Sequence, residues 1–262
     1  EQACTEYCDE IYAFLRQDEV RSMVRADYMQ QQTDINCKMR VILTDWLVEV
    51  HLKFKLRQET LYLTFQLIDR FLQANVVARQ RLQLVGVTAL MIAAKYEEIY
   101  PPEVRDYVYI CDNAYTREQI LDMEQLILRR LDFRLSLPTV WSWINRFVKA
   151  AGKADEPAFF HLVSFVVELA MVDLLDKKML KYLPSLLTAA AVHTALTVRG
   201  EEGWSARLQH HTRYSLPDLA GCAADLKALL LQIGTEPRYR ALHKKYSHPK
   251  YSEVATLALT HL

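Results

Sequence analysis

The stretch that decides the fold reads CKMRVILTDWLVEVHLK and spans residues 37–53. Placed on a helix at about 100° per residue, it is apolar nearly all round, and such a helix is buried or covered by another element. Arg40 and Asp45 interrupt this apolar surface. Because an unpaired buried charge is costly, we expect an acidic partner for Arg40. Asp69, beside the apolar arc of residues 61–72, is the candidate.

Outward from this stretch, almost every segment repeats apolar residues at i, i+3, i+4 and i+7, which predicts amphipathic helices. The 262 residues include only six glycines and eight prolines, which argues against an all-β fold built on tight turns. The expected helices are residues 5–20, 37–53, 58–73, 81–97, 102–110 and 117–131, followed by 139–150, 156–175, 183–198, 204–212 and 216–233.

Two of these helices have a predicted start. Thr116 and Gln119 have the spacing of a capping box for the helix of residues 117–131. In the helix of residues 102–110, Pro102 is expected in the first turn, where the missing N–H of proline costs nothing.

The chain divides near its middle, at residues 135–138, where a proline breaks the helical period. Each half then holds about five helices. Helices 81–97 and 183–198 are both apolar and rich in small residues, which allow close approach of neighbouring helices. Duplication of one helical bundle explains this similarity, and two unrelated core helices are the alternative.

Composition excludes several classes of protein. Lys plus Arg and Asp plus Glu balance at 32 each, so no bulk charge draws the chain to nucleic acid or anionic lipid. The longest apolar run, residues 84–94, is about half of what a membrane span needs. The polar opening without Met indicates a fragment with no secretion signal. Five cysteines without a CxxC pair indicate reduced thiols, so we expect localisation in the nucleus and cytoplasm.

No catalytic motif emerges from the chain. GxSxG, P-loop, GxGxxG and HExxH patterns are missing from the sequence. His210 and His211 are adjacent, so their side chains diverge on a helix and cannot share a metal. We therefore expect no enzyme, no metal and no cofactor. Pattern alone predicts an all-α binding module of two similar bundles.

The decisive stretch also carries a resemblance to a known family. Residues 39–50 closely resemble the opening of the cyclin box. The same resemblance is carried by residues 59–62, 68–72, 82–86 and 95–103, and it extends to residues 10–16, 180–185 and 244–246. Within that family the chain is most similar to the mitotic A-type and B-type members. Residues 180–185 and 138–140 look A-like, whereas residues 53–56 and 95–98 look B-like, so the subtype stays open.

The resemblance implies an all-α fold of two tandem five-helix cyclin-fold repeats preceded by an N-terminal helix. It implies no catalytic activity of the chain's own and a heterodimer with a cyclin-dependent kinase, which the chain would activate by holding the kinase αC helix in place during G2/M. The alternative is a cyclin-fold scaffold that binds peptides or DNA without a kinase. The expected division is residues 1–36 for helix and linker, 37–135 and 136–235 for the repeats, and 236–262 for the tail.

The resemblance also implies which residues bind the kinase. Lys95 and Glu124 match the charged pair that fixes the kinase αC segment, although pattern alone favours two solvated surface charges. The apolar contacts beside that pair match Tyr96, Phe133 and Leu135, and the preceding helix contributes Tyr7, Ile11 and Phe14. Arg40 and Asp69 match an internal, structural ion pair. By alignment of the two repeats, Leu196 occupies the position of Lys95, so we expect the second repeat to lack the charged clamp.

A second implied site docks Arg-x-Leu type motifs of substrates and inhibitors. Ordinary core packing is the alternative explanation for its apolar members, and the spacing of residues 39–49 does not separate the two. The apolar members are Met39, Ile42, Leu43, Trp46, Leu82 and Ile110, the acidic members are Glu49 and Asp112, and the polar rim is Arg79 and Gln83.

Overall fold

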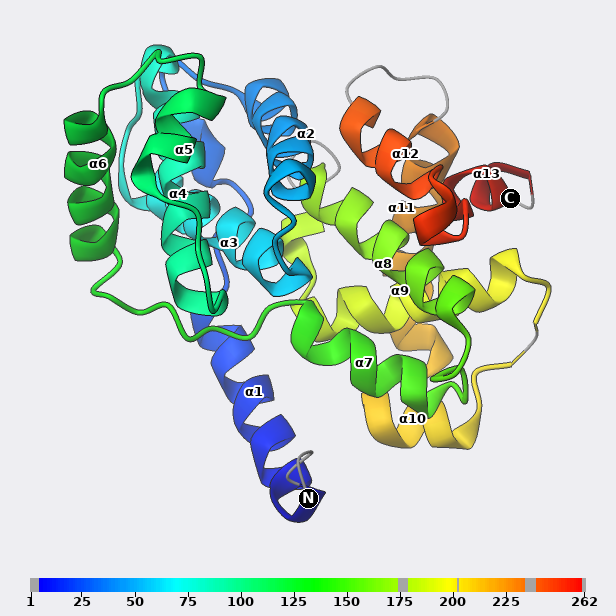
Figure 1. Ribbon diagram of the computed structural model, residues 1–262. Coiled ribbons are helices and arrows are strands. Elements are labelled where there is room, and N and C mark those ends of the chain that lie inside the picture. Colours follow the sequence, from blue (N-terminus) through cyan, green and yellow to red (C-terminus); the bar gives the residue numbers. More distant parts are fainter. Residues whose placement is uncertain (1–4, 174–178, 202, 234–238, 261–262) are drawn as a thin grey trace.

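The computed structural model describes residues 5–173, 179–201, 203–233 and 239–260, and all regular structure within them is helical (Figure 1). The first repeat comprises α2 (Cys37–Phe54), α3 (Gln58–Ala74), α4 (Leu82–Glu97), α5 (Val104–Ile110) and α6 (Arg117–Arg130). The second comprises α7 (Trp141–Ala150), α8 (Pro157–Val172), α9 (Pro184–Val198), α10 (Ala206–Thr212) and α11 (Leu216–Ile233). Helix α1 (Cys8–Ser22) precedes them, and α12 (Arg240–Tyr246) and α13 (Val254–Thr260) follow. Short 3-10 turns lie at Thr5–Tyr7, Tyr28–Gln31, Arg79–Arg81, Met179–Lys181 and Pro249–Tyr251.

Each repeat is built around one central helix. Helix α4 contacts α2, α3, α5 and α6, and α9 contacts α7, α8, α10 and α11. Gly86 lets α2 pack closely on α4, because a Cβ atom there would lie 2.7 Å from Cδ1 of Leu43 and would displace that side chain. The same central position of the two small-residue helices favours duplication over two unrelated core helices.

The expected helices form, with differences at their ends. The capping box of Thr116 and Gln119 is present in both directions. The prediction for Pro102 was wrong: α5 begins only at Val104, after both prolines, because a capping box between Glu103 and Asp106 sets the start of the helix. Glu103 instead caps this helix, with its backbone N–H donating to Asp106. The predicted end of the eighth helix at residue 175 lies outside the described residues.

The two tail helices were not predicted. Helices α12 and α13 have seven residues each, too few for a clear apolar period. Helix α12 lies against both α2 and α8, and therefore touches both repeats (Figure 1). The Asp45 carboxylate of α2 accepts hydrogen bonds from the backbone N–H groups of Ala241 (2.9 Å) and Leu242 (3.0 Å) at the start of α12. An acidic side chain at a helix N-terminus is favourable, so Asp45 anchors the tail to the first repeat.

Buried ion pairs join the repeats to each other and to the tail. The Arg40 guanidinium of α2 binds Asp69 of α3 and also donates to the carbonyl of Val172 (2.8 Å) at the end of α8. The Lys245 ammonium of α12 lies 2.7 Å from the Glu168 carboxylate of α8, and both side chains are fully buried. These contacts fix how the two repeats sit relative to each other.

Candidate partner-binding surfaces

Helix α1 is held at the junction of the two repeats by one of its faces. The Tyr12 ring packs on the Trp143 ring at a centroid distance of 5.5 Å. Seven residues further, the Glu19 carboxylate accepts hydrogen bonds from the N–H (2.9 Å) and Oγ (2.6 Å) of Ser185 at the start of α9. The neighbouring Asp18 forms an ion pair with Arg134 of the first repeat. Adjacent acidic residues thus fasten α1 to different repeats.

The other face of α1 is apolar and uncovered. Tyr7, Ile11 and Phe14 have the i, i+4, i+7 spacing of one helix face, and all three are exposed, Phe14 by 62%. A contiguous exposed apolar stripe is unusual on a protein surface and marks a contact site. Tyr7 is the N-cap of α1 and the other two lie within the helix, and these are the three residues singled out there from the sequence.

Lys95 and Glu124 form an ion pair on the first repeat. Lys95 lies in the last turn of α4 and Glu124 in α6, with Nζ 2.7 Å from Oε1. The lysine side chain is 44% exposed and the glutamate 14%. A pair of this exposure contributes about 1 kcal/mol or less to stability. The ammonium has three donors, so two of them remain available to a partner.

Aromatic side chains border this pair. Tyr96 follows Lys95 and is exposed, and its hydroxyl forms a hydrogen bond with Ser136 Oγ. Phe133 is 66% exposed and has a φ of 55°, the left-handed region that a bulky residue rarely adopts. Such backbone strain is common where a side chain is presented for function. Leu135 is half-buried nearby.

The Lys95–Glu124 pair and its neighbours Tyr96, Phe133 and Leu135 form one surface, which we call the α4–α6 surface. The stripe of α1 extends this surface. The loop of residues 132–136 connects its parts, because Ser136 bonds Tyr96 and Arg134 binds Asp18 of α1. Ile99 and Tyr100, just after α4, extend the exposed apolar area. Sequence reasoning missed these two residues, since nothing in the helical period distinguishes an exposed loop residue from a buried one.

The residues predicted to dock peptide motifs lie at the other end of α4. Seven of them line one depression of about 290 Å³: Met39, Ile42, Leu43, Trp46, Arg79, Leu82 and Gln83. Ile42 is 63% exposed, whereas Leu43 and Leu82 are buried and form the floor. The depression is therefore part surface and part core: core packing accounts for Leu43 and Leu82, and docking by the exposed members stays a prediction. We call it the docking depression.

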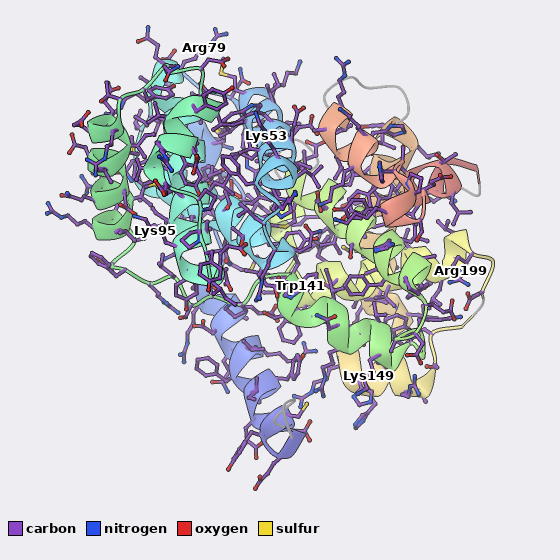
Figure 2. The ribbon with its side chains drawn as sticks, in the orientation of Figure 1. Lys53, Arg79, Lys95, Trp141, Lys149 and Arg199 are labelled. Atoms are coloured by element: carbon purple, nitrogen blue, oxygen red, sulfur yellow. The ribbon has the colours of Figure 1, made fainter. Side chains whose placement is uncertain are left out.

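The remaining members of that predicted set lie outside the depression. Glu49 is exposed one turn further along α2, Ile110 is half-buried at the end of α5, and Asp112 is exposed just beyond it. Figure 2 separates Arg79, on the rim of the depression, from Lys95, on the α4–α6 surface. The two sets of residues thus lie at opposite ends of α4.

At the position that corresponds to Lys95 of α4, helix α9 of the second repeat carries Leu196. Leu196 is the third-last residue of α9, as Lys95 is of α4, and it is buried. An apolar, buried residue at this position cannot bind a partner through charge. This placement agrees with the alignment of the repeats.

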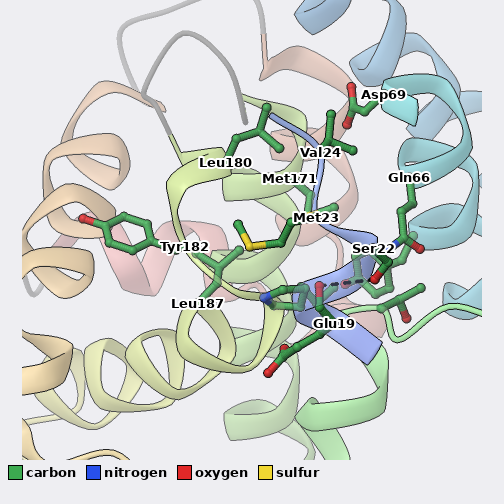
Figure 3. Close-up of a pocket in the computed structure, with 14 residues that line it drawn as sticks. Glu19, Ser22, Met23, Val24, Gln66, Asp69, Met171, Leu180, Tyr182 and Leu187 are labelled. Atoms are coloured by element: carbon green, nitrogen blue, oxygen red, sulfur yellow. Dashed lines mark hydrogen bonds between the residues drawn. The ribbon is translucent and has the colours of Figure 1, made fainter. Parts of the chain in front are cut away.

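A small cavity lies at the junction of the two repeats. The small cavity of Figure 3 lies where α1, α3, α8 and α9 meet, with Gln66, Met171 and Leu187 in its wall. It encloses about 70 Å³, enough for a few water molecules and too little for a drug-sized ligand. In the described part of the chain, no helix has the length and apolarity of a membrane span.

Comparisons with known proteins agree with this architecture. The family model described as "Cyclin, N-terminal domain" matches residues 10–136, and that described as "Cyclin, C-terminal domain" matches residues 138–259. The Arabidopsis thaliana protein Cyclin-B2-2 is 47% identical over 255 residues, which cover 97% of this chain and 58% of that protein. Cyclin-B2-1 of Oryza sativa subsp. japonica is 47% identical over 251 residues, which cover 95% of this chain and 58% of that protein.

Among solved structures, a viral cyclin from herpesvirus saimiri superposes with a TM-score of 0.74 at 18% identity, covering 83% of this chain and 95% of that one. At this identity the match shows the fold alone. The two plant relatives carry B-type names, whereas the sequence marks alone left the A and B types unseparated. This chain spans about 58% of the length of those relatives.

Proposed function

The chain belongs to the cyclin family, and on this premise we propose that it binds a cyclin-dependent protein kinase and activates it as a non-catalytic regulatory subunit in cell-cycle control at G2/M. A subunit of this kind acts as a ligand that binds the active kinase conformation more tightly than the inactive one. The required step is to hold the kinase αC helix inward, where its Glu pairs with the β3 Lys.

The α4–α6 surface carries this proposal. The Lys95–Glu124 pair, with its half-exposed lysine and with exposed Tyr96 and Phe133 beside it, supports the proposal most directly. Two free ammonium donors and a carboxylate can bind backbone carbonyl and N–H groups at a helix end of the kinase. The exposed rings then bury against apolar side chains of the same kinase helix.

The stripe of α1 extends the contact. Tyr7, Ile11 and Phe14 present three large side chains that nothing in the described chain covers. Their burial against the kinase would add apolar area at about 25 cal/mol per Å². Because Asp18 and Glu19 fasten α1 to both repeats, this stripe is preorganised for binding.

We propose a separate role for the docking depression, the recruitment of substrates and inhibitors that carry Arg-x-Leu type motifs. The leucine of the motif would lie on the floor made by Leu43 and Leu82, and its arginine would bind the exposed Glu49 carboxylate.

We further propose that the complex works in the nucleus and cytoplasm, which imaging of a fluorescent fusion would test.

The test of activation is peptide phosphorylation by a purified cyclin-dependent kinase with and without this chain. We expect activity only with the chain, and loss of binding by about thirtyfold in Lys95→Ala/Glu124→Ala, the effect of removing one interface hot spot of about 2 kcal/mol. The matched control is Thr197→Glu/His193→Glu on α9, the central helix without the charged pair. Equal loss in the control variant, or no activation by the wild-type chain, contradicts the proposal.

A comparison of two substrates distinguishes the role of the docking depression from that of the α4–α6 surface. Ile42→Asp/Trp46→Ala is expected to weaken phosphorylation of a substrate with an Arg-x-Leu motif and to leave a peptide without the motif unaffected. A loss of activity on both substrates would show that the depression serves kinase binding instead.

A further inference from the structure

A second, larger groove lies beside the docking depression. It runs between α2 and the C-terminal tail and has a volume of about 910 Å³, against about 290 Å³ for the depression. Lys53 lines it from α2, and Arg240, Lys244 and Lys250 line it from the tail. We call it the tail groove.

The tail groove has a surplus of positive charge. Lys53, Arg240, Lys244 and Lys250 are all exposed, and none of them forms an ion pair within the described residues. The ammonium groups of Lys53 and Lys250 lie near the rings of Tyr109 and Tyr251, each at 5.6 Å from the centroid, which orients them without neutralising them.

The other charges of the groove are already satisfied inside the protein. Lys245 is paired with the buried Glu168, and Asp45 accepts the N–H groups at the start of α12. Glu49 is the carboxylate that remains, against four cations. Since the whole chain has a formal net charge of zero, this surplus is local. Unneutralised cations gathered in a groove favour an anionic ligand.

The groove continues the docking depression. Ile42 and Trp46 line both of them, and Glu49 follows on the same face of α2. A helix rises about 1.5 Å per residue, so Lys53 lies about 6 Å beyond Glu49 along α2. An extended peptide spans this distance in about two residues. A peptide whose arginine binds Glu49 therefore carries its preceding residues into the tail groove.

We propose that the tail groove binds a phosphorylated serine or threonine located about two to five residues before the arginine of a docked Arg-x-Leu motif. A phosphate carries a charge of about −1.5 to −2 and three strong acceptor oxygens, so it binds several of the four cations more strongly than a carboxylate, which has one charge and two oxygens. The inference rests on the proposed function, because a kinase partner is the source of such phosphates and the docking depression places the peptide.

Fluorescence anisotropy of labelled peptides on the full chain tests the proposal. The peptides share one Arg-x-Leu motif and carry serine, phosphoserine or aspartate three residues before the arginine. We expect phosphoserine to lower the Kd about tenfold relative to serine, with aspartate giving a much smaller gain. Lys53→Ala/Lys244→Ala should abolish the gain and leave the affinity for the serine peptide unchanged, which also reports that the variant is folded.

The matched control is Lys149→Ala/Lys227→Ala, which removes two exposed lysines of the second repeat and should keep the gain. The proposal is overturned if phosphoserine gives no gain, if the gain survives in Lys53→Ala/Lys244→Ala, or if aspartate gives the same gain. Displacement of the phosphopeptide by a single-stranded oligonucleotide at equal concentration would also overturn it, in favour of a nucleic-acid site. Failure of every peptide to bind would overturn the docking depression as well, whereas kinase activation, measured separately, reports on the α4–α6 surface.

Discussion

Arg40 and Asp69 form a two-point ion pair, with Nε 2.6 Å from Oδ1 and Nη2 2.7 Å from Oδ2, in which neither side chain is more than 2% exposed. The Tyr28 hydroxyl donates to the same Oδ1 at 2.6 Å. Because Arg40 also donates to the Val172 carbonyl at 2.8 Å, one guanidinium holds the first repeat together and fastens it to the second. The pair is thus an internal support and faces no partner.

Arg40→Met is expected to lower the free energy of unfolding by about 3–5 kcal/mol, because it leaves the Asp69 carboxylate buried without a counter-ion. Urea unfolding of the purified chain measures the change. Arg25 supplies a matched control, since its pair with Asp27 is long (3.9 Å) and both side chains are at least 60% exposed. Arg25→Met should change stability by less than about 1 kcal/mol. Equal losses in the two variants would refute the structural role of Arg40.

Asp45→Ala is expected to loosen α12 with little effect elsewhere. The Asp45 carboxylate accepts the N–H groups of Ala241 and Leu242, and losing such a cap costs about 1–2 kcal/mol. Hydrogen exchange should therefore speed up in residues 240–246 specifically. Asp218→Ala, which removes a hydrogen-bonded turn at the start of α11, is the control and should leave those amides protected. Unchanged exchange of α12 in Asp45→Ala would contradict the anchoring role.

The sequence predicted the helices and the Arg40–Asp69 pair for physical reasons. Apolar residues that recur with the period of a helix predict helices directly. The free-energy cost of a buried, unpaired charge makes an acidic partner for Arg40 necessary. The Lys95–Glu124 pair was different, because an exposed charge does not need a partner. Only the family resemblance singled out these two residues. Its proximity, 2.7 Å, became visible when α4 and α6 were placed side by side.

Long-range contacts to backbone groups could not be predicted. Asp45 was noticed as an interruption of an apolar helix, yet its partners are N–H groups of α12, 196 and 197 residues away. Any N–H group of the chain could have served equally. For the same reason, nothing in the adjacent Asp18 and Glu19 indicated that they bind different repeats. The tail groove was hidden as well, because it exists only where α12 lies against α2.

Stability should depend on pH through His51. Burial, with a smaller contribution from the Lys245 ammonium, lowers the pKa of His51 from 6.5 to about 4. Between these values the unfolded chain binds a proton that the folded chain does not, so stability falls as the pH drops from 6.5 to 4 and levels off below. The whole effect amounts to about 3 kcal/mol.

His51→Gln isolates this contribution. The His51 Nε2 donates to the Arg57 carbonyl at 2.9 Å, and a glutamine amide can replace that donor without titrating. Urea unfolding of both proteins at several pH values, from 4 to 7, gives the difference in stability. We expect it to shrink steadily as the pH falls through the window. A constant difference would show that His51 has its ordinary pKa in the folded chain.

The buried Lys245–Glu168 pair gives a prediction that separates stability from function. Lys245→Met should cost about 3–5 kcal/mol, because Glu168 would retain only neutral donors, Tyr246 and Gln58, for its charge. Lys245→Met/Glu168→Gln should recover most of this loss, since the amide needs no counter-ion. At a temperature where each variant is folded, both should bind the kinase as the wild type does, because the pair lies in the tail contact and the α4–α6 surface is untouched. Weaker kinase binding by the folded double variant would show that the tail contributes to the kinase interface.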